Sequence, residues 1–191
     1  MVIAIDGPAG AGKSTVARML ADALGYRFLD SGAMYRAAAL VNDADADIDL
    51  RDGRVYVGER DVSDEIRTQA ISEAASKLAS DPDKRTKIIA RQRALAAHGD
   101  WVIEGRDAAS AIAPDADLKI FLTASVDERA RRRAAQTGEP LDEVTKEIKE
   151  RDVRDDTLGR SVLRPADGAI TVDTTGLTLD EVIAKIRSLH P

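Results

Sequence analysis

The sequence predicts an α/β fold with a five-stranded, parallel core sheet and helices on both faces. Five short apolar runs have the length and composition of buried strands, at residues 2–5, 26–29, 101–103, 118–122 and 169–172. Helical segments separate these runs. Strands that alternate with helices are typical of a mostly parallel sheet.

Two helices are expected directly after the first two strands. Val16 and Leu20 lie on one side of a helix over 14–24, and Gly25 ends it. A second helix is expected over 32–41. The chain therefore begins in strand–helix–strand–helix order.

The pattern then changes, and residues 42–98 are expected to form an insertion between core strands. The acidic stretch 42–50 is expected to be a loop, and 54–62 alternates about a glycine like a small hairpin. Ser63 is expected to cap a helix whose apolar face extends to Leu78.

Capping signals mark the remaining helices. They are Asp81 with Pro82, Ser125 with Glu128, and Thr178 with Glu181. The first of these helices is expected to end near Gly99. The TGEP stretch at 137–140 breaks the second, and the chain is helical again over 141–154.

The composition is that of one ordinary globular domain. The chain has 191 residues, of which 43% are hydrophobic and 32% charged. Its net charge of −6 argues against a nucleic-acid-binding or anionic-membrane surface. The sequence has no cysteine and only two histidines, which excludes disulfides, thiolate metal sites and a histidine metal cage. Without a signal-peptide or transmembrane pattern, we expect a cytoplasmic protein with no membrane partner.

The stretch GPAGAGKS at 7–14 fits the phosphate-binding pattern G-x-x-x-x-G-K-[ST], with a strand before it and a helix after it. Glycines allow positive φ angles and remove Cβ atoms, so backbone N–H groups can converge on phosphate oxygens. The helix N-terminus adds donors and a partial positive charge. The alternative is a glycine-rich turn without a ligand, but the Lys-Ser pair in this context favours a nucleoside triphosphate.

The chemistry of this loop assigns roles to its residues. Lys13 is expected to reach the β- and γ-phosphates, and the Ser14 hydroxyl is expected to bind Mg²⁺. The predicted ATP-binding residues are Gly7, Pro8, Ala9, Gly10, Ala11, Gly12, Lys13, Ser14 and Thr15.

Several classes of protein share this loop. A GTPase usually needs an [NT]-K-x-D motif to read its base, and a motor ATPase needs a strand ending in an acidic pair; neither is present. Instead, DSGAMYR at 30–36 follows the second strand, where open α/β sheets bind ligands. Ser31 offers a hydroxyl and Arg36 a guanidinium suited to a phosphate, although this segment could also be a solvated helix face.

Several stretches together resemble the bacterial cytidylate kinase family. They are IDGPAGAGKST, LDSGAMYR, DEIRT at 64–68, EGRD at 104–107, PDADLKIFLTAS at 114–125, IKERD at 148–152 and DTTG at 173–176. The resemblance covers nearly the whole chain. It implies a P-loop NTPase fold with three parts: a core of residues 1–41, 99–127 and 155–191, a small monophosphate-binding insertion at about 42–98, and a helical lid at about 128–154.

The resemblance also implies an activity, the transfer of a phosphoryl group from ATP to CMP or dCMP with Mg²⁺, in pyrimidine metabolism. A monomer that binds no nucleic acid is expected. The alternatives are a kinase for UMP or another small acceptor, and a nucleotide-dependent switch without turnover. The GRD and EIRT stretches argue against a metabolite acceptor, and Lys13 with the lid arginines argues against a switch.

The resemblance assigns the acceptor site residue by residue. The CMP phosphate and the transferred group would be clamped by Arg36, Arg106 and Arg151. Arg67 is a further candidate for the monophosphate end. The family reads cytosine with a serine, an arginine and the GRD aspartate, which match Ser76, Arg85 and Asp107 here. Asp155 matches the family aspartate that contacts the sugar. The predicted substrate-binding residues are Ser31, Arg36, Arg67, Ser76, Arg85, Arg106, Asp107, Arg151 and Asp155.

Each of the base-reading assignments has a plainer alternative. Ser76 alone could be a polar helix residue, and Arg85 a surface residue. Asp107 could instead be the structural partner of Arg106 or of another arginine. A carboxylate suits the cytosine amino group and would repel the carbonyl that uracil has there.

The RARRR stretch at 129–133 could be a solvated helix face or a closing element of the lid. Arg129 and Arg133 lie one helical turn apart, with Arg132 near that face and Arg131 pointing elsewhere. Arginines that close on the phosphoryl group would stabilise its negative charge. The predicted catalytic residues are Lys13, Arg106, Arg129, Arg132, Arg133 and Arg151.

The chain departs from the family in three places. Residues 37–62 are shorter than the usual insertion, and AASAIA at 108–113 replaces a Gly-Thr-Val-Val-Phe-like run. Leu158 stands where the family commonly has an arginine that helps to read the nucleotide. We expect Arg160 to take over that contact.

Overall fold

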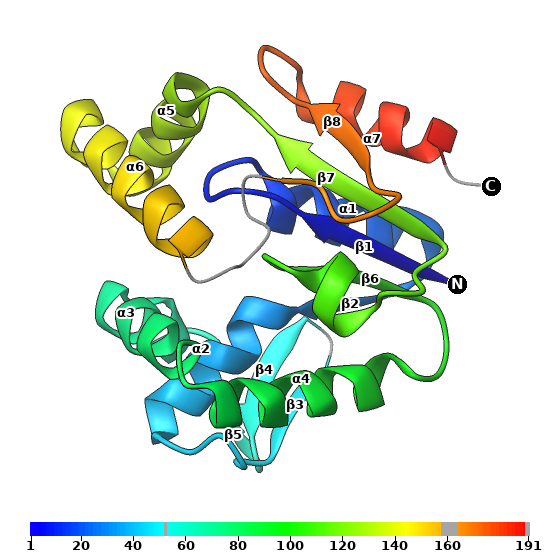
Figure 1. Ribbon diagram of the computed structural model, residues 1–191, viewed down its shortest axis with the longest axis vertical. Helices are drawn as coiled ribbons and strands as arrows, with labels where there is room; N and C mark the ends of the chain where they lie inside the picture. The colour runs from blue at the N-terminus through cyan, green and yellow to red at the C-terminus, as the bar shows by residue number, and fades with distance from the viewer. Residues whose placement is uncertain (52, 158–163, 190–191) are drawn as a thin grey trace.

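A computed structural model describes residues 1–51, 53–157 and 164–189 (Figure 1). The elements, in chain order, are β1 (Val2–Asp6), α1 (Lys13–Leu24), β2 (Arg27–Asp30), α2 (Ser31–Val41), β3 (Ile48–Arg51), β4 (Arg54–Val57), β5 (Arg60–Asp61), η1 (Glu65–Arg67), α3 (Gln69–Leu78), α4 (Pro82–Ala96), β6 (Trp101–Glu104), η2 (Ala108–Ile112), β7 (Leu118–Thr123), α5 (Val126–Thr137), α6 (Leu141–Thr157), β8 (Ile170–Asp173) and α7 (Leu179–Leu189).

The core is a parallel five-stranded sheet with the order β2-β6-β1-β7-β8, as the sequence predicts. β1 lies at its centre, where Ile3 pairs with Val102 of β6 and with Leu118 of β7. Parallel strands place all their carboxyl ends at one edge of the sheet, so the loops after β1, β2 and β6 meet there.

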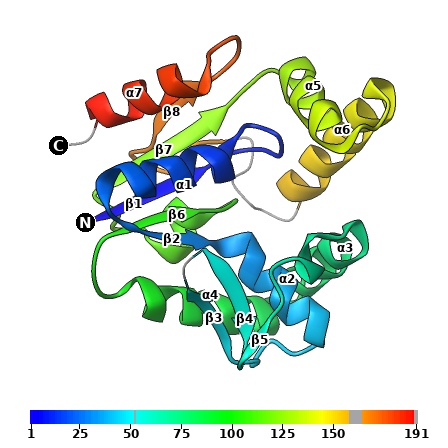
Figure 2. The ribbon, with the colours of Figure 1, turned by 180° about the vertical axis from the view of Figure 1, so that it is seen from behind.

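Helices cover both faces of the sheet because its strands are apolar on both sides. Ile3 and Ile5 of β1 belong to a buried cluster with Leu20 of α1 and Ile186 of α7. Ala4, between them, faces a second cluster that contains Ile112 of η2. Figure 1 looks onto the η2 face, and Figure 2 shows α1 and α7 on the opposite face.

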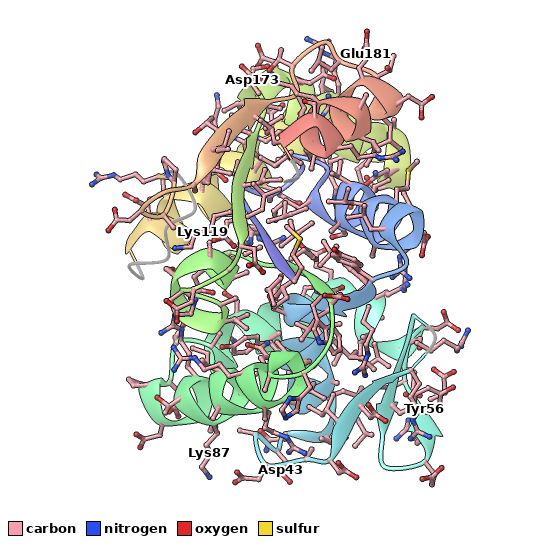
Figure 3. All side chains as sticks on the ribbon, turned by 90° about the vertical axis from the view of Figure 1, so that its right-hand side faces the viewer. Asp43, Tyr56, Lys87, Lys119, Asp173 and Glu181 are labelled. Atoms are coloured by element: carbon pink, nitrogen blue, oxygen red, sulfur yellow. The ribbon has the colours of Figure 1, made fainter. Side chains whose placement is uncertain are left out.

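The insertion packs a three-stranded antiparallel sheet, β3-β4-β5, against α2 in a core of its own. The predicted hairpin is confirmed as β4 and β5. The expectation of a loop over 42–50 is wrong at its end, because residues from Ile48 form β3 and pair with β4. In Figure 3, Asp43 and Lys87 of this part lie at the opposite end of the molecule from Asp173 and Glu181.

The predicted start of the first insertion helix is also wrong. The Ser63 hydroxyl accepts a hydrogen bond from the Val55 N–H (2.9 Å), which ties it to β4. The helix α3 begins instead at Gln69, where the Thr68 hydroxyl accepts from the Ile71 N–H. By contrast, Asp81 caps α4 as predicted, accepting from two backbone N–H groups.

The segment predicted to be a lid contains α5 and α6, which form an antiparallel hairpin beside the carboxyl edge of the sheet (Figure 1). Ala130, Val144 and Ile148 form the small core between them. The predicted capping box of α5 is half made: Ser125 accepts from the Glu128 N–H, while the Glu128 carboxylate binds Arg132 instead of turning back. The box of α7 is complete in both directions.

Candidate active site

A cleft of about 1410 Å³ opens at the carboxyl edge of the sheet, between the phosphate loop, the insertion and the lid. It brings together most of the residues that the sequence predicts for the site. Those that line it are Ala9, Gly10, Lys13, Ser14, Thr15, Ser31, Arg36, Arg67, Ser76, Arg85, Arg106, Asp107, Arg133 and Arg151. These residues are far apart in the chain, but they share one cavity because several elements end at it or pass it: α2, α3, α4, β6, α5 and α6.

The backbone of the phosphate loop has the conformation that its glycines allow. Gly7 has a φ angle of 148°, and a Cβ atom there would lie 1.9 Å from the Leu122 carbonyl oxygen of β7. Gly12, with a φ of 90°, precedes α1 directly. The loop can therefore turn tightly between β1 and the N-terminus of α1, where the first N–H groups of the helix favour an anion.

Lys13 is buried at the start of α1, and its ammonium group donates to the Pro8 carbonyl oxygen at 2.9 Å. Burial lowers the pKa of Lys13, and the nearby Arg106 guanidinium lowers it further. A bound polyphosphate would add negative charge beside this lysine, beyond that of Glu104 and Asp6.

Glu104 belongs to the EGRD stretch at 104–107, but no role for it is predicted from the sequence. It is the last residue of β6 and 6% exposed, and its carboxylate accepts from the Ser14 hydroxyl at 2.8 Å. Burial raises the pKa of Glu104, and the neighbouring Asp30 raises it further. A carboxylate at the end of an otherwise apolar strand was the signal that could have identified it.

Four charged residues on the predicted acceptor side form two ion pairs. Asp30 caps α2 by accepting from the Ala33 N–H and also pairs with Arg36 at 3.0 Å. Arg85 of α4 pairs with Asp107 after β6. Two of the three residues predicted to read the base, Arg85 and Asp107, thus contact each other. The structural alternative for Asp107 is therefore also realised, with Arg85 as the partner.

The remaining predicted acceptor residues line the same cleft. Arg67 donates through Nε to the Ser63 carbonyl oxygen at 3.1 Å, and Ser76 is half-buried on α3. Ser31 is buried at the start of α2. Gly105 allows the close approach of Ser31, whose hydroxyl would lie 2.5 Å from a Cβ atom at that position.

The lid arginines fall into two groups. Arg133 of α5 and Arg151 of α6 line the cleft. Arg129 is 3% exposed and pairs with Asp152 of α6 through two hydrogen bonds, the shorter at 2.7 Å. Arg132 binds Glu128 and Thr174.

Arg129 also reaches the phosphate loop. Its guanidinium donates to the Ala9 carbonyl oxygen at 3.1 Å and to the carbonyl oxygen of Ala124, the residue after β7. Its predicted contact with the transferred group stays a prediction, as does that of Arg132. Arg131 is exposed and pairs with Glu128, so it points away from the site as expected.

Some predictions lie outside the described residues. Leu158 and Arg160 belong to the segment 158–163, and the side chain of Asp155 is not described either. The expected replacement by Arg160 therefore stays a prediction, as does the sugar contact of Asp155.

The strand order and the phosphate loop at the end of the central strand define a P-loop kinase fold. A shikimate kinase from Acinetobacter baumannii in complex with shikimate shares it, with a TM-score of 0.52 and 18% identity over 98% of this chain and 91% of that one. A gluconokinase from Sinorhizobium meliloti 1021 has a TM-score of 0.54 and 20% identity over 96% of this chain and 87% of the gluconokinase. These identities establish the fold alone.

The family follows from the sequence comparisons. The family model described as cytidylate kinase matches residues 3–190. The cytidylate kinases of Streptococcus gordonii and Carboxydothermus hydrogenoformans are both 43% identical to this chain. The alignment with the first spans 97% of this chain and 94% of the relative, and the alignment with the second spans 99% of this chain and 96% of the relative. The chain belongs to the cytidylate kinase family. Within the part that the structure describes, no helix is both long and apolar enough to cross a membrane.

Proposed function

We propose that this protein transfers the γ-phosphoryl group of ATP to CMP or dCMP, giving ADP and the cytidine diphosphate. The observation that carries the proposal is one cleft lined by Lys13 of the phosphate loop, by Arg106 and Arg151, whose charges act on Lys13, and by the Arg85–Asp107 pair. One cavity thus offers a polyphosphate site, phosphate-binding arginines and a hydrogen-bonding pair suited to a base.

The reaction needs positioning and positive charge more than acid–base chemistry. An oxygen of the CMP phosphate attacks the γ-phosphorus, the bond to the β–γ bridging oxygen breaks, and ADP leaves with the electron pair. The acceptor phosphate has a second pKa of about 6 and is therefore mostly a dianion near neutral pH, so no general base is required. Lys13, Arg106 and Arg151 stabilise the charge that spreads over the transferred group.

The donor set beside the phosphate loop fits Mg²⁺. Ser14 and Glu104 offer a hydroxyl and a carboxylate within hydrogen-bond distance of each other, and Mg²⁺ prefers oxygen ligands. Ser14 would hold the ion together with the phosphates, and Glu104 would orient the Ser14 hydroxyl. When bound, the ion neutralises charge on the β- and γ-phosphates.

The Arg85–Asp107 pair supports a cytosine acceptor. Asp107 can accept from the exocyclic amino group of cytosine, while the Arg85 guanidinium can donate to the ring carbonyl. Uracil has a carbonyl in place of that amino group and would leave the carboxylate repelled and unpaired. A cytoplasmic, monomeric enzyme of pyrimidine metabolism fits this proposal.

An ADP-release assay with ATP and Mg²⁺ tests the function, with CMP, dCMP, UMP and AMP as acceptors. We expect the fastest turnover with CMP and dCMP. Arg106→Ala removes one of the closing charges and should slow the reaction about a hundredfold, or about 3 kcal/mol. Preference for UMP or AMP would reject the assignment of the base-reading pair, and no turnover with any acceptor would reject the kinase.

A further inference from the structure

Asp6 is a buried carboxylate that the proposed reaction does not use. It is the last residue of β1, 2% exposed, and directly precedes Gly7 of the phosphate loop. Its two oxygens accept hydrogen bonds from the N–H groups of Ala108 and Ala109, at 2.7 and 2.9 Å. A buried side chain with both oxygens committed to another segment connects the two segments firmly.

The two N–H groups open η2, the short helix that follows the acceptor-side motif. The first N–H groups of a helix have no partner inside it and need an acceptor from elsewhere. Asp107 stands at the usual capping position, but it makes no capping hydrogen bond and pairs with Arg85 instead. Asp6 supplies the missing acceptor from the neighbouring strand.

We propose that Asp6 is a positioning residue for the acceptor nucleotide: by capping η2, it fixes Arg106 and Asp107 relative to the phosphate loop. The inference rests on the proposed function, which places the acceptor phosphate at Arg106 and the base at Asp107. A second hydrogen bond, from the Gly105 N–H to the Ile5 carbonyl oxygen (3.1 Å), holds the start of the same segment to β1. Donor and acceptor loops are thereby held to the end of one strand.

The electrostatics of the site agree with this role. Burial raises the pKa of Asp6 to about 6, and the two backbone hydrogen bonds and Lys13 oppose the rise while Asp107 adds to it. At neutral pH the ionised form prevails, and only that form accepts at both oxygens without presenting an O–H to a backbone N–H.

Asp6→Asn tests the proposal, because it keeps the shape but places an NH₂ group opposite one of the two donors. The KM for CMP should rise about tenfold or more, since a hydrogen bond to a charged acceptor is lost. A shift of Arg106 by about 1 Å should lower kcat on the order of a hundredfold. The KM for ATP should stay within about threefold, because sheet pairing still holds the phosphate loop.

Asp117→Asn is the matched control. The Asp117 carboxylate accepts from the Val2 N–H at 2.7 Å, at the opposite end of β1 from the cleft. The same chemical change there should leave both KM values and kcat unaltered. Asp6→Glu, which keeps both oxygens but displaces them, should reproduce the selective rise in the KM for CMP if Asp6→Asn does not fold.

Amide exchange of the wild-type protein gives a readout that needs no variant. The N–H groups of Ala108 and Ala109 should be protected before CMP is added, because Asp6 already holds them. Protection that appears only with CMP, or an unchanged KM for CMP in the folded Asp6→Asn enzyme, would overturn the proposal. A wild-type protein that does not phosphorylate CMP would instead reject the proposed function.

Discussion

The phosphate loop and the lid hold their functional groups in different ways. The loop uses consecutive residues and backbone geometry: Gly7 lies against the Leu122 carbonyl, and Lys13 binds back to Pro8. The lid uses side chains from separate helices, and its buried Arg129 is bound to Asp152 of α6. The role of Lys13 in the loop is therefore set by its position in the motif, whereas the role of an arginine in the lid depends on which residue it contacts in the folded protein.

The largest effect should come from the loop. Lys13→Ala removes the buried cation that faces the phosphates, and turnover should fall on the order of a thousandfold. Steady-state kinetics with saturating ATP and CMP measures it. Lys149→Ala, an exposed lysine of α6, is the control and should leave turnover intact. Equal losses in the two variants would mean that net charge, and not the position of Lys13, matters.

In the lid, Arg129→Ala should act on stability. It leaves the Asp152 carboxylate buried without its partner, which should lower the free energy of unfolding by about 3 kcal/mol or more. Urea unfolding measures this change. Arg131→Ala, on the same helix but with its side chain 64% exposed, should change it by less than about 0.5 kcal/mol. A stable but slow Arg129→Ala enzyme would favour direct contact with the transferred group.

A smaller effect should appear in the pH dependence of stability. The pKa of Asp6 is about 6 in the folded protein, against an ordinary value of 3.8 for an aspartate, so the folded state binds more protons between these values. The free energy of unfolding should therefore fall as pH rises from about 4 to 6, with a contribution of up to about 3 kcal/mol from this group. Asp6→Asn should remove that part of the slope in urea unfolding at pH 4.5 and 7. Parallel slopes for the two proteins would contradict it.

The sequence could predict the parts of the molecule that local chemistry decides. The predictions of the five core strands, of the glycine-rich turn between β1 and α1 and of the α4 and α7 caps depend on neighbouring residues and are confirmed. Strand β3 is not predicted because it begins inside the acidic stretch 42–50, whose composition indicates a loop until β4 pairs with it. Ser63 and Thr68 offer similar caps, and the bond from Val55 to Ser63 decides between them.

The features that the sequence could not predict depend on contacts between residues that are distant in the chain. Asp6 meets Ala108 across 102 positions, and Ser14 meets Glu104 across 90. No local pattern encodes such a pairing, although a carboxylate at the end of an apolar strand indicates that a buried partner is needed. Arg129 and Arg133 look equivalent by helical spacing, and only the position of α6 separates them.

The most direct test of the account is the preference for CMP over UMP in wild-type, Arg85→Ala, Asp107→Ala and double-variant enzymes. If the pair reads cytosine, each single change should lower the ratio of kcat/KM for CMP to that for UMP by about tenfold or more. The double variant should lose little more, because the two residues act as one unit. A ratio unchanged by Asp107→Ala would contradict the account and assign the pair to structure alone.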